Sequence, residues 1–155
     1  MSVEIERKFL ILKVPQNLKK TKGKLIFQGY LAVEEGGNEV RIRKKEQHYF
    51  MTVKNTGKLQ RKEAEINIHK KEFDRLLPLC GERTVEKTRY EIPFGKHTIE
   101  LDVFSGQHKG LMVAEVEFKD EKESLHFKKP AWFGREVTAL QSYKNKNLAV
   151  HGLPN

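Results

Sequence analysis

The stretch Val3-Glu4-Ile5-Glu6-Arg7-Lys8-Phe9, near the start of the chain, decides the fold class because apolar and charged residues alternate along it. Successive side chains of a β-strand point to opposite faces, so Glu4, Glu6 and Lys8 share one face and the apolar side chains share the other. A repeat of two residues predicts a strand, whereas an amphipathic helix would repeat every 3.6 residues.

The same alternation recurs along the 155-residue chain, near residues 3–12, 25–33, 38–45, 48–55, 61–69, 83–93, 96–104 and 111–119. Three short links are typical of hairpins and predict antiparallel neighbours: Glu35-Gly36-Gly37-Asn38, Asn55-Thr56-Gly57-Lys58 and Pro93-Phe94-Gly95-Lys96. Helices are expected at 70–79, at 120–128 after an Asp120 N-cap, and more weakly at 138–149. The chain is expected to form one mainly β domain, residues 1–155, with a few flanking helices.

The charged positions of these strands are grouped by sign. The acidic positions are Glu4, Glu6, Glu63, Glu65, Glu100, Asp102, Glu115 and Glu117, and the cationic positions are Lys8, Arg41, Arg43, Lys54, Lys87 and Arg89. Eight antiparallel strands are enough to close a barrel, which would gather these charges in its lumen. An open sheet whose charges face water explains the alternation equally well, and the pattern alone leaves both readings open.

Composition narrows the range of partners. Lys and Arg outnumber Asp and Glu by 30 to 21, and a formal net charge of +9 attracts polyanions without choosing among them. No recognised nucleic-acid motif accompanies the basic residues, and no window approaches 18 apolar residues, so neither nucleic acid nor a membrane is expected as a partner. The single cysteine, Cys80, suits a reducing cytoplasm and lies in an apolar setting that predicts a buried thiol.

The two groups of charges fit complementary parts of one ligand. Hard divalent cations such as Mg²⁺ and Mn²⁺ prefer carboxylate oxygens, and Glu4 and Glu6 would lie about 7 Å apart on one strand face. Guanidinium and ammonium groups bind phosphate oxygens. A site with both halves matches a linear polyphosphate bridged to a metal ion.

Several motifs together resemble those of the CYTH family, also called triphosphate tunnel metalloenzymes. The first is Val3-Glu4-Ile5-Glu6-Arg7-Lys8, which has the ExExK pattern of that family. Others follow in order across nearly the whole chain, among them Gln28-Gly29-Tyr30-Leu31, Val40-Arg41-Ile42-Arg43, Thr52-Val53-Lys54, Lys87-Thr88-Arg89-Tyr90, Glu100-Leu101-Asp102, Glu115-Val116-Glu117 and Tyr143-Lys144-Asn145. The resemblance implies a closed eight-stranded antiparallel β-barrel, the triphosphate tunnel, that needs Mg²⁺ or Mn²⁺ for activity.

The resemblance also implies roles for individual residues. It marks Glu4, Glu6 and Glu117 as metal ligands, with Asp102 and Glu115 close by, and Arg41, Arg43, Lys54, Lys87 and Arg89 as triphosphate binders. Glu63 and Glu65, with help from Glu100, would order the attacking water or a second metal. Lys8 would contact phosphate or, paired with Tyr30, act in proton transfer.

Three functions follow from these expectations. The first is metal-dependent hydrolysis of a small-molecule triphosphate, above all inorganic tripolyphosphate, to pyrophosphate and phosphate. The second is adenylyl cyclisation of the class IV type, or thiamine triphosphate hydrolysis, on the same fold. The third is a non-enzymatic polyphosphate-binding module, which the carboxylates disfavour because they would repel a polyanion unless a metal intervenes. The oligomeric state is left open, with a homodimer as one alternative.

Overall fold

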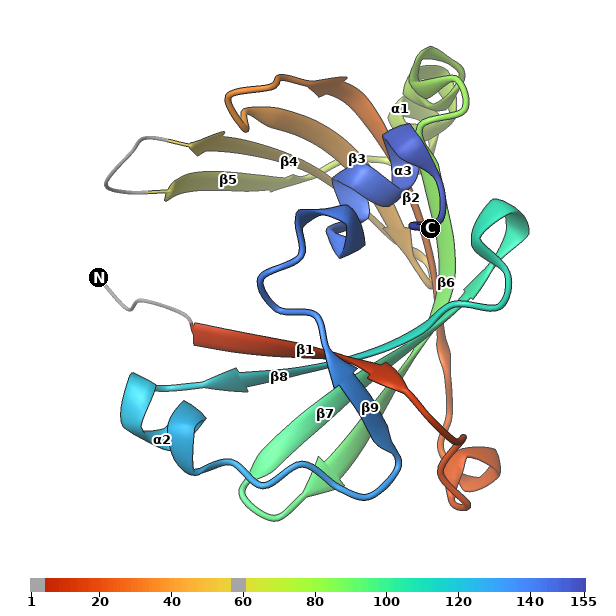
Figure 1. Ribbon diagram of the computed structural model, residues 1–155. Helices are drawn as coiled ribbons and strands as arrows, with labels where there is room; N and C mark the ends of the chain where they lie inside the picture. Colours follow the sequence, from red (N-terminus) through yellow and green to blue (C-terminus); the bar gives the residue numbers. More distant parts are fainter. Residues whose placement is uncertain (1–4, 57–60) are drawn as a thin grey trace.

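The computed structural model describes residues 5–56 and 61–155, and Figure 1 shows their course. Within these residues nine strands form one antiparallel sheet in the order β5-β4-β3-β2-β6-β7-β8-β1-β9. The strands are β1 (Ile5–Ile11), β2 (Lys24–Val33), β3 (Glu39–Lys45), β4 (His48–Thr56), β5 (Arg61–Asn67), β6 (Thr84–Phe94), β7 (His97–Ser105), β8 (Met112–Phe118) and β9 (Phe133–Glu136). The α-helices are α1 (Lys70–Leu76), α2 (Glu121–His126) and α3 (Asn145–His151), and the 3₁₀ turns are η1 (Leu18–Lys20), η2 (Leu77–Cys80), η3 (Gly106–His108) and η4 (Gln141–Tyr143).

The eight strands expected from alternation are all present. The β2–β3 and β6–β7 hairpins are confirmed, and their turns use Gly37 at φ 100° and Gly95 at φ 60°, a region that side chains disfavour. β4 and β5 pair in antiparallel register as expected, although residues 57–60 of their link lie outside the described residues. The side chain of Asp120 accepts a hydrogen bond from the Glu123 backbone N–H, which confirms it as the N-cap of α2.

The expectation of a closed eight-stranded barrel is wrong. Closure would require β1 to pair with β5, but the second edge of β1 pairs with the short strand β9, and β5 ends the sheet. Figure 1 shows the result: the sheet curves strongly, and β4–β5 face β1–β8 across an opening without meeting. The first and last of the eight expected strands are still neighbours, because β1 pairs directly with β8 and places Glu6 opposite Glu117.

Two apolar clusters cover the outer face of the curved sheet. Beside β2–β4, Phe73 of α1 and Cys80 of η2 pack on Ile42, and Cys80 is fully buried as expected. Gly29 on β2 permits this contact, because a Cβ atom there would lie 2.6 Å from the Cys80 sulfur. Beside β7, β8 and β1, a second cluster gathers around Phe9 and Phe133 and includes Phe118 and Leu101.

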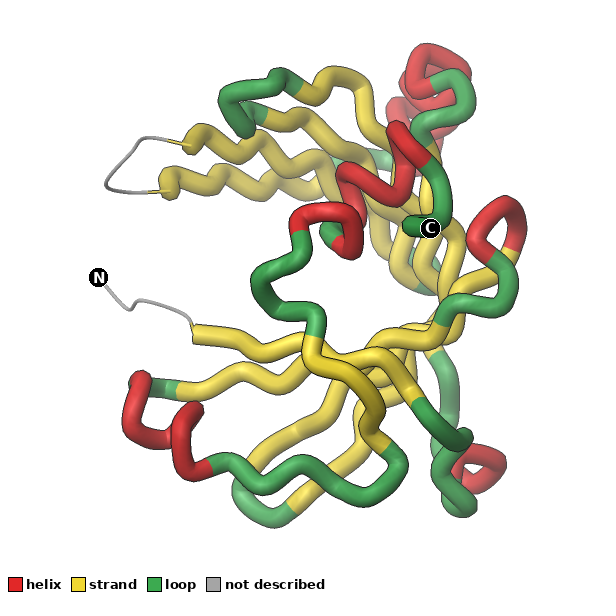
Figure 2. Tube along the Cα trace, in the orientation of Figure 1, coloured by secondary structure: helices red, strands yellow, loops and turns green. Residues whose placement is uncertain are grey.

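The C-terminal segment packs inside the curve. Leu148 and Ala149 of α3 contact a cluster that contains Tyr30, Val85 and Phe104 on the inner face. Figure 2 shows α1 and α2 outside the curve and the C-terminal helical segments across its opening. The inner face is therefore apolar at the end covered by α3, and its charged positions are left at the open end.

Candidate functional site

A cavity of about 300 Å³ lies on the inner face of the sheet, and its lining is almost entirely charged. It will be called the charged cavity. Its walls include most of the residues that the sequence predicts for the site: Glu6, Lys8, Tyr30, Arg41, Arg43, Lys54, Glu63, Arg89, Glu115 and Glu117. Glu39, Lys144, Asn145 and Lys146 also line it. Seven of these side chains are cationic and five are acidic, so the described lining has a cationic surplus.

Strand register explains why distant residues meet here. Arg41 lies opposite Tyr30 in the β2–β3 pair, and Lys54 lies opposite Glu39 on one side and Glu63 on the other. Directly opposed residues of antiparallel strands point to the same face, so one alternating set from each strand reaches the cavity. The curvature of the sheet then brings these sets toward one another.

Arg41, Arg43 and Lys54 form one side of the cavity, which will be called the basic wall. Burial, together with the neighbouring charges of Arg41 and Arg89, lowers the pKa of Arg43 to about 10. The pKa of Lys54 is lowered as well, first by burial and then by Arg41. In the described part of the chain, Nε of Arg41 is buried and has no hydrogen-bond partner. Such crowded, incompletely satisfied cations are suited to an anionic ligand.

A buried network of opposite charges lies beside the basic wall. Asp102 accepts from Arg89 through both carboxylate oxygens, at 2.8 and 2.9 Å, and its Oδ2 lies 2.8 Å from Nζ of Lys87. Burial alone would raise the pKa of Asp102, but Lys87 and Arg89 hold it well below its usual value. Lys87 is fully buried, its pKa is lowered to about 8 mainly by desolvation, and it also donates to Oδ1 of Asn145 over 3.1 Å.

The opposite side of the cavity carries the carboxylates of β1 and β8. The pKa of the Glu115 carboxyl is raised by burial, by its hydrogen bond to Glu6 and by the negative charge of Glu6. Glu117 lies opposite Glu6 in the strand register. A cation between Glu6 and Glu115 would relieve their repulsion, and carboxylate oxygens are ligands that hard divalent ions prefer. The residues on this wall therefore fit a metal ion, although within 5–56 and 61–155 no three acidic, histidine or cysteine side chains form a complete site by themselves.

Five predicted residues are not part of the described cavity lining, and one of them is Asp102 of the buried network. Glu4 lies outside the described residues. Glu65 and Glu100 do not line the cavity: Glu65 accepts from Oγ1 of Thr52 over 3.1 Å, and Glu100 lies 3.0 Å from an Arg89 nitrogen. Lys87 is likewise behind the lining, in the network with Asp102. Lys8 does line the cavity, and its Nζ lies 3.3 Å from the Tyr143 carbonyl oxygen and 3.8 Å from the Glu115 carboxylate.

Several residues of the site were assigned no role from the sequence. Glu39 lies two positions before Arg41 and Gln28 two positions before Tyr30, so extending the alternation by one step would have found both. Lys144, Asn145 and Lys146 follow no alternation, since they belong to the start of α3 and reach the cavity only because that helix packs inside the curve. Lys144 and Asn145 belong to the family motif Tyr143-Lys144-Asn145, but the motif alone did not indicate that they reach the cavity.

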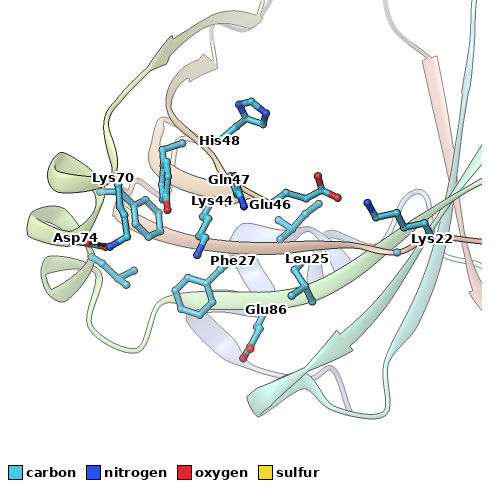
Figure 3. A pocket seen from close by; sticks show the side chains of 15 residues that line it. Lys22, Leu25, Phe27, Lys44, Glu46, Gln47, His48, Lys70, Asp74 and Glu86 are labelled. Carbon is cyan, nitrogen blue, oxygen red and sulfur yellow. Dashed lines mark hydrogen bonds and ion pairs between the residues drawn. The ribbon is translucent and has the colours of Figure 1, made fainter.

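A larger cavity, about 790 Å³, lies on the outer face between α1 and strands β2–β4. Figure 3 shows the ring of Phe27 and the aliphatic side chain of Leu25 near Lys44. It also shows the ion pair of Lys70 with Asp74. Its three lysines are matched by three acidic side chains, and much of its lining is apolar. It lacks the separation of charges that a polyphosphate with a metal ion requires, so the charged cavity is the stronger candidate.

Comparison with known proteins agrees with this architecture. The model of the CYTH domain family matches residues 2–149, and the chain belongs to that family. A protein of Nitrosomonas europaea named inorganic triphosphatase is 44% identical over 149 residues, which cover 95% of this chain and 97% of that relative. An inorganic triphosphatase of Acetivibrio thermocellus is 38% identical over 157 residues, covering 100% and 98% of the two chains.

The fold comparison gives the same relationship. A crystal structure of an inorganic triphosphatase matches with a TM-score of 0.81 and 40% sequence identity, covering 99% of both chains. Triphosphatases of the CYTH family depend in general on a metal ion. None of the helices in the described part of the chain is long and apolar enough to span a membrane.

Proposed function

We propose that this protein hydrolyses inorganic tripolyphosphate to pyrophosphate and phosphate with the help of Mg²⁺ or Mn²⁺. The observation that carries the proposal is the charged cavity, where the buried Nε of Arg41 has no partner among the described residues and cations outnumber carboxylates. The names of two relatives, similar over nearly their whole length, support hydrolysis of a triphosphate.

The cationic residues bind the phosphate chain. Arg41, Arg43 and Lys54 of the basic wall face the cavity, and the planar guanidinium groups can each take two phosphate oxygens. Arg89 contributes a third guanidinium whose direction is fixed by Asp102. Lys87 is buried behind these groups and adds positive potential, while Lys8 lies on the lining and is close enough to the carboxylate wall to reach a phosphate beside it.

The carboxylates of β1 and β8 would hold the metal ion. Glu6, Glu115 and Glu117 belong to this set, and the family motif adds Glu4, two residues before Glu6 in the sequence. A bound divalent ion neutralises phosphate charge and withdraws electrons from the phosphorus. Asp102 was expected among these ligands, but both its oxygens face Lys87 and Arg89, so we assign it the role of orienting those two cations.

Hydrolysis consumes one water molecule. The water oxygen forms a bond to a terminal phosphorus, the bridging P–O bond breaks, and pyrophosphate leaves. Glu63 lines the cavity and can accept a hydrogen bond from the attacking water, which leaves Glu65 and Glu100 to hold Thr52 and Arg89. Because phosphoryl transfer depends mainly on position and charge, these residues account for the chemistry without a covalent intermediate.

Adenylyl cyclisation and thiamine triphosphate hydrolysis need a wall for an organic group. Among the described residues that line the charged cavity, Tyr30 is the only aromatic one, and its ring is buried in the apolar cluster. Recognition in this cavity is therefore directed at phosphate rather than at a base or a thiazolium ring.

The test is to assay tripolyphosphate, ATP and thiamine triphosphate in turn, each with Mg²⁺, with Mn²⁺ and with EDTA. Tripolyphosphate should be cut fastest, at a rate at least about tenfold above ATP, because all the binding groups address phosphate. EDTA should abolish the reaction. Cyclic AMP and pyrophosphate as the main products from ATP would establish the cyclase instead, and binding of tripolyphosphate without turnover under any condition would leave a binding module.

A further inference from the structure

Gln28 forms a fully buried link between two residues of the charged cavity. It lies on β2 two residues before Tyr30 and opposite Arg43 of β3, and it has no exposed surface. Its carboxamide oxygen accepts from Nε of Arg43 over 2.9 Å, and its nitrogen donates to the hydroxyl of Tyr30 over 2.9 Å. Both neighbours line the cavity, whereas Gln28 lies behind them.

The chemistry of arginine fixes which end of the amide faces each partner. A guanidinium can only donate hydrogen bonds, so the Gln28 atom beside Arg43 must be the oxygen. The NH₂ group then necessarily faces the Tyr30 hydroxyl, whose oxygen must accept. The guanidinium of Arg41, opposite Tyr30 in the strand register, is close enough for its positive charge to act on the same hydroxyl.

We propose that Gln28 is a positioning residue that leaves the Tyr30 hydroxyl with one free role, to donate its hydrogen to a phosphate oxygen in the charged cavity. The assignment of phosphate as the acceptor rests on the proposed triphosphate function. The direction of the hydrogen bond from Gln28 to Tyr30 rests on the geometry alone. Tyr30 therefore acts as a donor to the substrate rather than as a base.

The surroundings of Tyr30 hold it to this role. Its side chain is 1% exposed and its ring packs with Val85, Phe104 and Leu148, so the hydroxyl cannot turn away from the cavity by moving the ring. Burial raises the pKa of Tyr30 to about 12, against the opposing charge of Arg41, and the hydroxyl thus keeps its proton at neutral pH. A neutral donor among cations can stabilise charge that builds up on a phosphate oxygen.

The first experiment needs no ligand. The substitution Gln28→Glu keeps the size of the side chain but leaves only acceptor oxygens, and Arg43 keeps the new carboxylate ionised. The Tyr30 hydroxyl must then donate to residue 28. The tyrosine Fermi doublet in the Raman spectrum distinguishes an accepting hydroxyl from a donating one, and subtracting the spectrum of Tyr30→Phe isolates Tyr30 from the other tyrosines. We expect an accepting hydroxyl in the wild type and a donating one in Gln28→Glu.

The second experiment is a double-mutant cycle read in kcat, KM and calorimetric binding of tripolyphosphate in EDTA. Tyr30→Phe should lower kcat/KM on the order of 100-fold, as loss of one preorganised donor does. Gln28→Glu should cost at least as much, but in the Tyr30→Phe background its extra cost should fall to roughly threefold or less, because the donor is already gone. The added charge is common to both backgrounds and cancels. Gln16→Glu, on an exposed loop, adds the same charge elsewhere and should match the wild type.

The outcomes are distinguishable. An equal cost of Gln28→Glu in both backgrounds, or an unchanged Raman doublet, overturns the proposal and leaves Gln28 as a support for Arg43. If Gln28→Glu does not fold, Gln28→Met serves the same cycle, since loss of the amide frees the hydroxyl to rotate, and an equal cost in both backgrounds again overturns the proposal. If the wild type neither binds nor hydrolyses tripolyphosphate, the proposed function fails, while the Raman comparison still decides the role of Gln28.

Discussion

Arg41 and Arg89 both line the charged cavity, but they differ in what neutralises them. Arg41 has a buried Nε without a partner in the described part of the chain, whereas Arg89 is bound through two nitrogens to Asp102 and lies 3.0 Å from Glu100. Removing an unneutralised cation relieves repulsion in the folded protein, while removing the partner of a buried carboxylate leaves that charge unpaired. The two arginines should therefore respond differently to the same substitution.

Arg41→Ala should lower kcat/KM for tripolyphosphate, which corresponds to a loss of roughly 2–4 kcal/mol in transition-state stabilisation. The melting temperature should stay close to that of the wild type. Arg89→Ala should lower both kcat/KM and the melting temperature, because Asp102 would remain buried beside Lys87 alone. Loss of one partner of a buried ion pair costs roughly 3–5 kcal/mol of stability. Steady-state kinetics and thermal unfolding of both variants provide the measurement. Equal melting temperatures for the two variants would show that the Asp102 network does not stabilise the fold.

At the scale of elements, α3 packs across the inner face of the sheet and closes one end of the charged cavity. Leu148 is fully buried in the cluster with Tyr30, and its carbonyl is 2.6 Å from Nε2 of the buried His108. Lys144 and Asn145 at the other end of the segment reach the charged cavity. The packing of the helix therefore decides where these polar groups lie.

Leu148→Ala should destabilise the protein by roughly 2–5 kcal/mol, the usual cost of truncating a buried leucine. Val150→Ala is a matched control on the same helix, because Val150 is 41% exposed and its loss should cost no more than about 0.5 kcal/mol. Denaturant unfolding of both variants measures the difference. A small effect of Leu148→Ala would mean that the packing of α3 contributes little to the free energy of unfolding and that the fold does not depend on this helix.

The elements also show what the sequence could and could not predict. Strands β1–β8 were predictable because each combines an apolar and a charged face with a period of two residues, and the hairpin links predicted the antiparallel pairing of β2 with β3, β4 with β5 and β6 with β7. β9 was missed because Phe133–Glu136 is only four residues long and includes Gly134. The reason for that glycine is a backbone contact, since a Cβ atom there would lie 3.2 Å from the Leu10 carbonyl oxygen, and no periodicity reveals such a contact.

The missed strand explains the wrong prediction of closure. Alternation states which side chains share a face, but not which edge of a strand is already occupied, and β9 occupies the edge of β1 that β5 would have needed. The same limit applies to the site. The alternation placed Glu65, Glu100 and Lys87 on the inner face with Arg41, but which inner-face side chains line the cavity depends on curvature and on α3, which the alternation does not describe.

At the scale of the whole molecule, the curved open sheet places a basic wall and a group of three carboxylates on opposite sides of one cavity, with Lys8 among the carboxylates and Glu39 and Glu63 beside Lys54 as the exceptions. Arg41, Arg43 and Lys54 come from β3 and β4, whereas Glu6, Glu115 and Glu117 come from β1 and β8. A polyanion alone would meet the carboxylates with repulsion, and a metal alone would meet the cations. The two ligands together satisfy both walls, so each should strengthen the binding of the other by the same factor.

Glu117→Gln tests this division of charge. The substitution keeps the size of the side chain and removes one carboxylate from the wall that we assign to the metal, opposite Glu6. Tripolyphosphate hydrolysis should fall by a large factor and recover only partly at high Mg²⁺ or Mn²⁺, whereas Arg41→Ala should keep the wild-type dependence on metal concentration at a lower rate.

Thermal unfolding with Mg²⁺ alone gives a readout without turnover, since an ion at 100 times its Kd stabilises the folded state by about 2.7 kcal/mol. That stabilisation should be smaller in Glu117→Gln than in the wild type and in Arg41→Ala. If Glu117→Gln matched the wild type in both measurements, the metal would have to be held elsewhere, and the carboxylates of β1 and β8 would then face the cavity without a function in binding it.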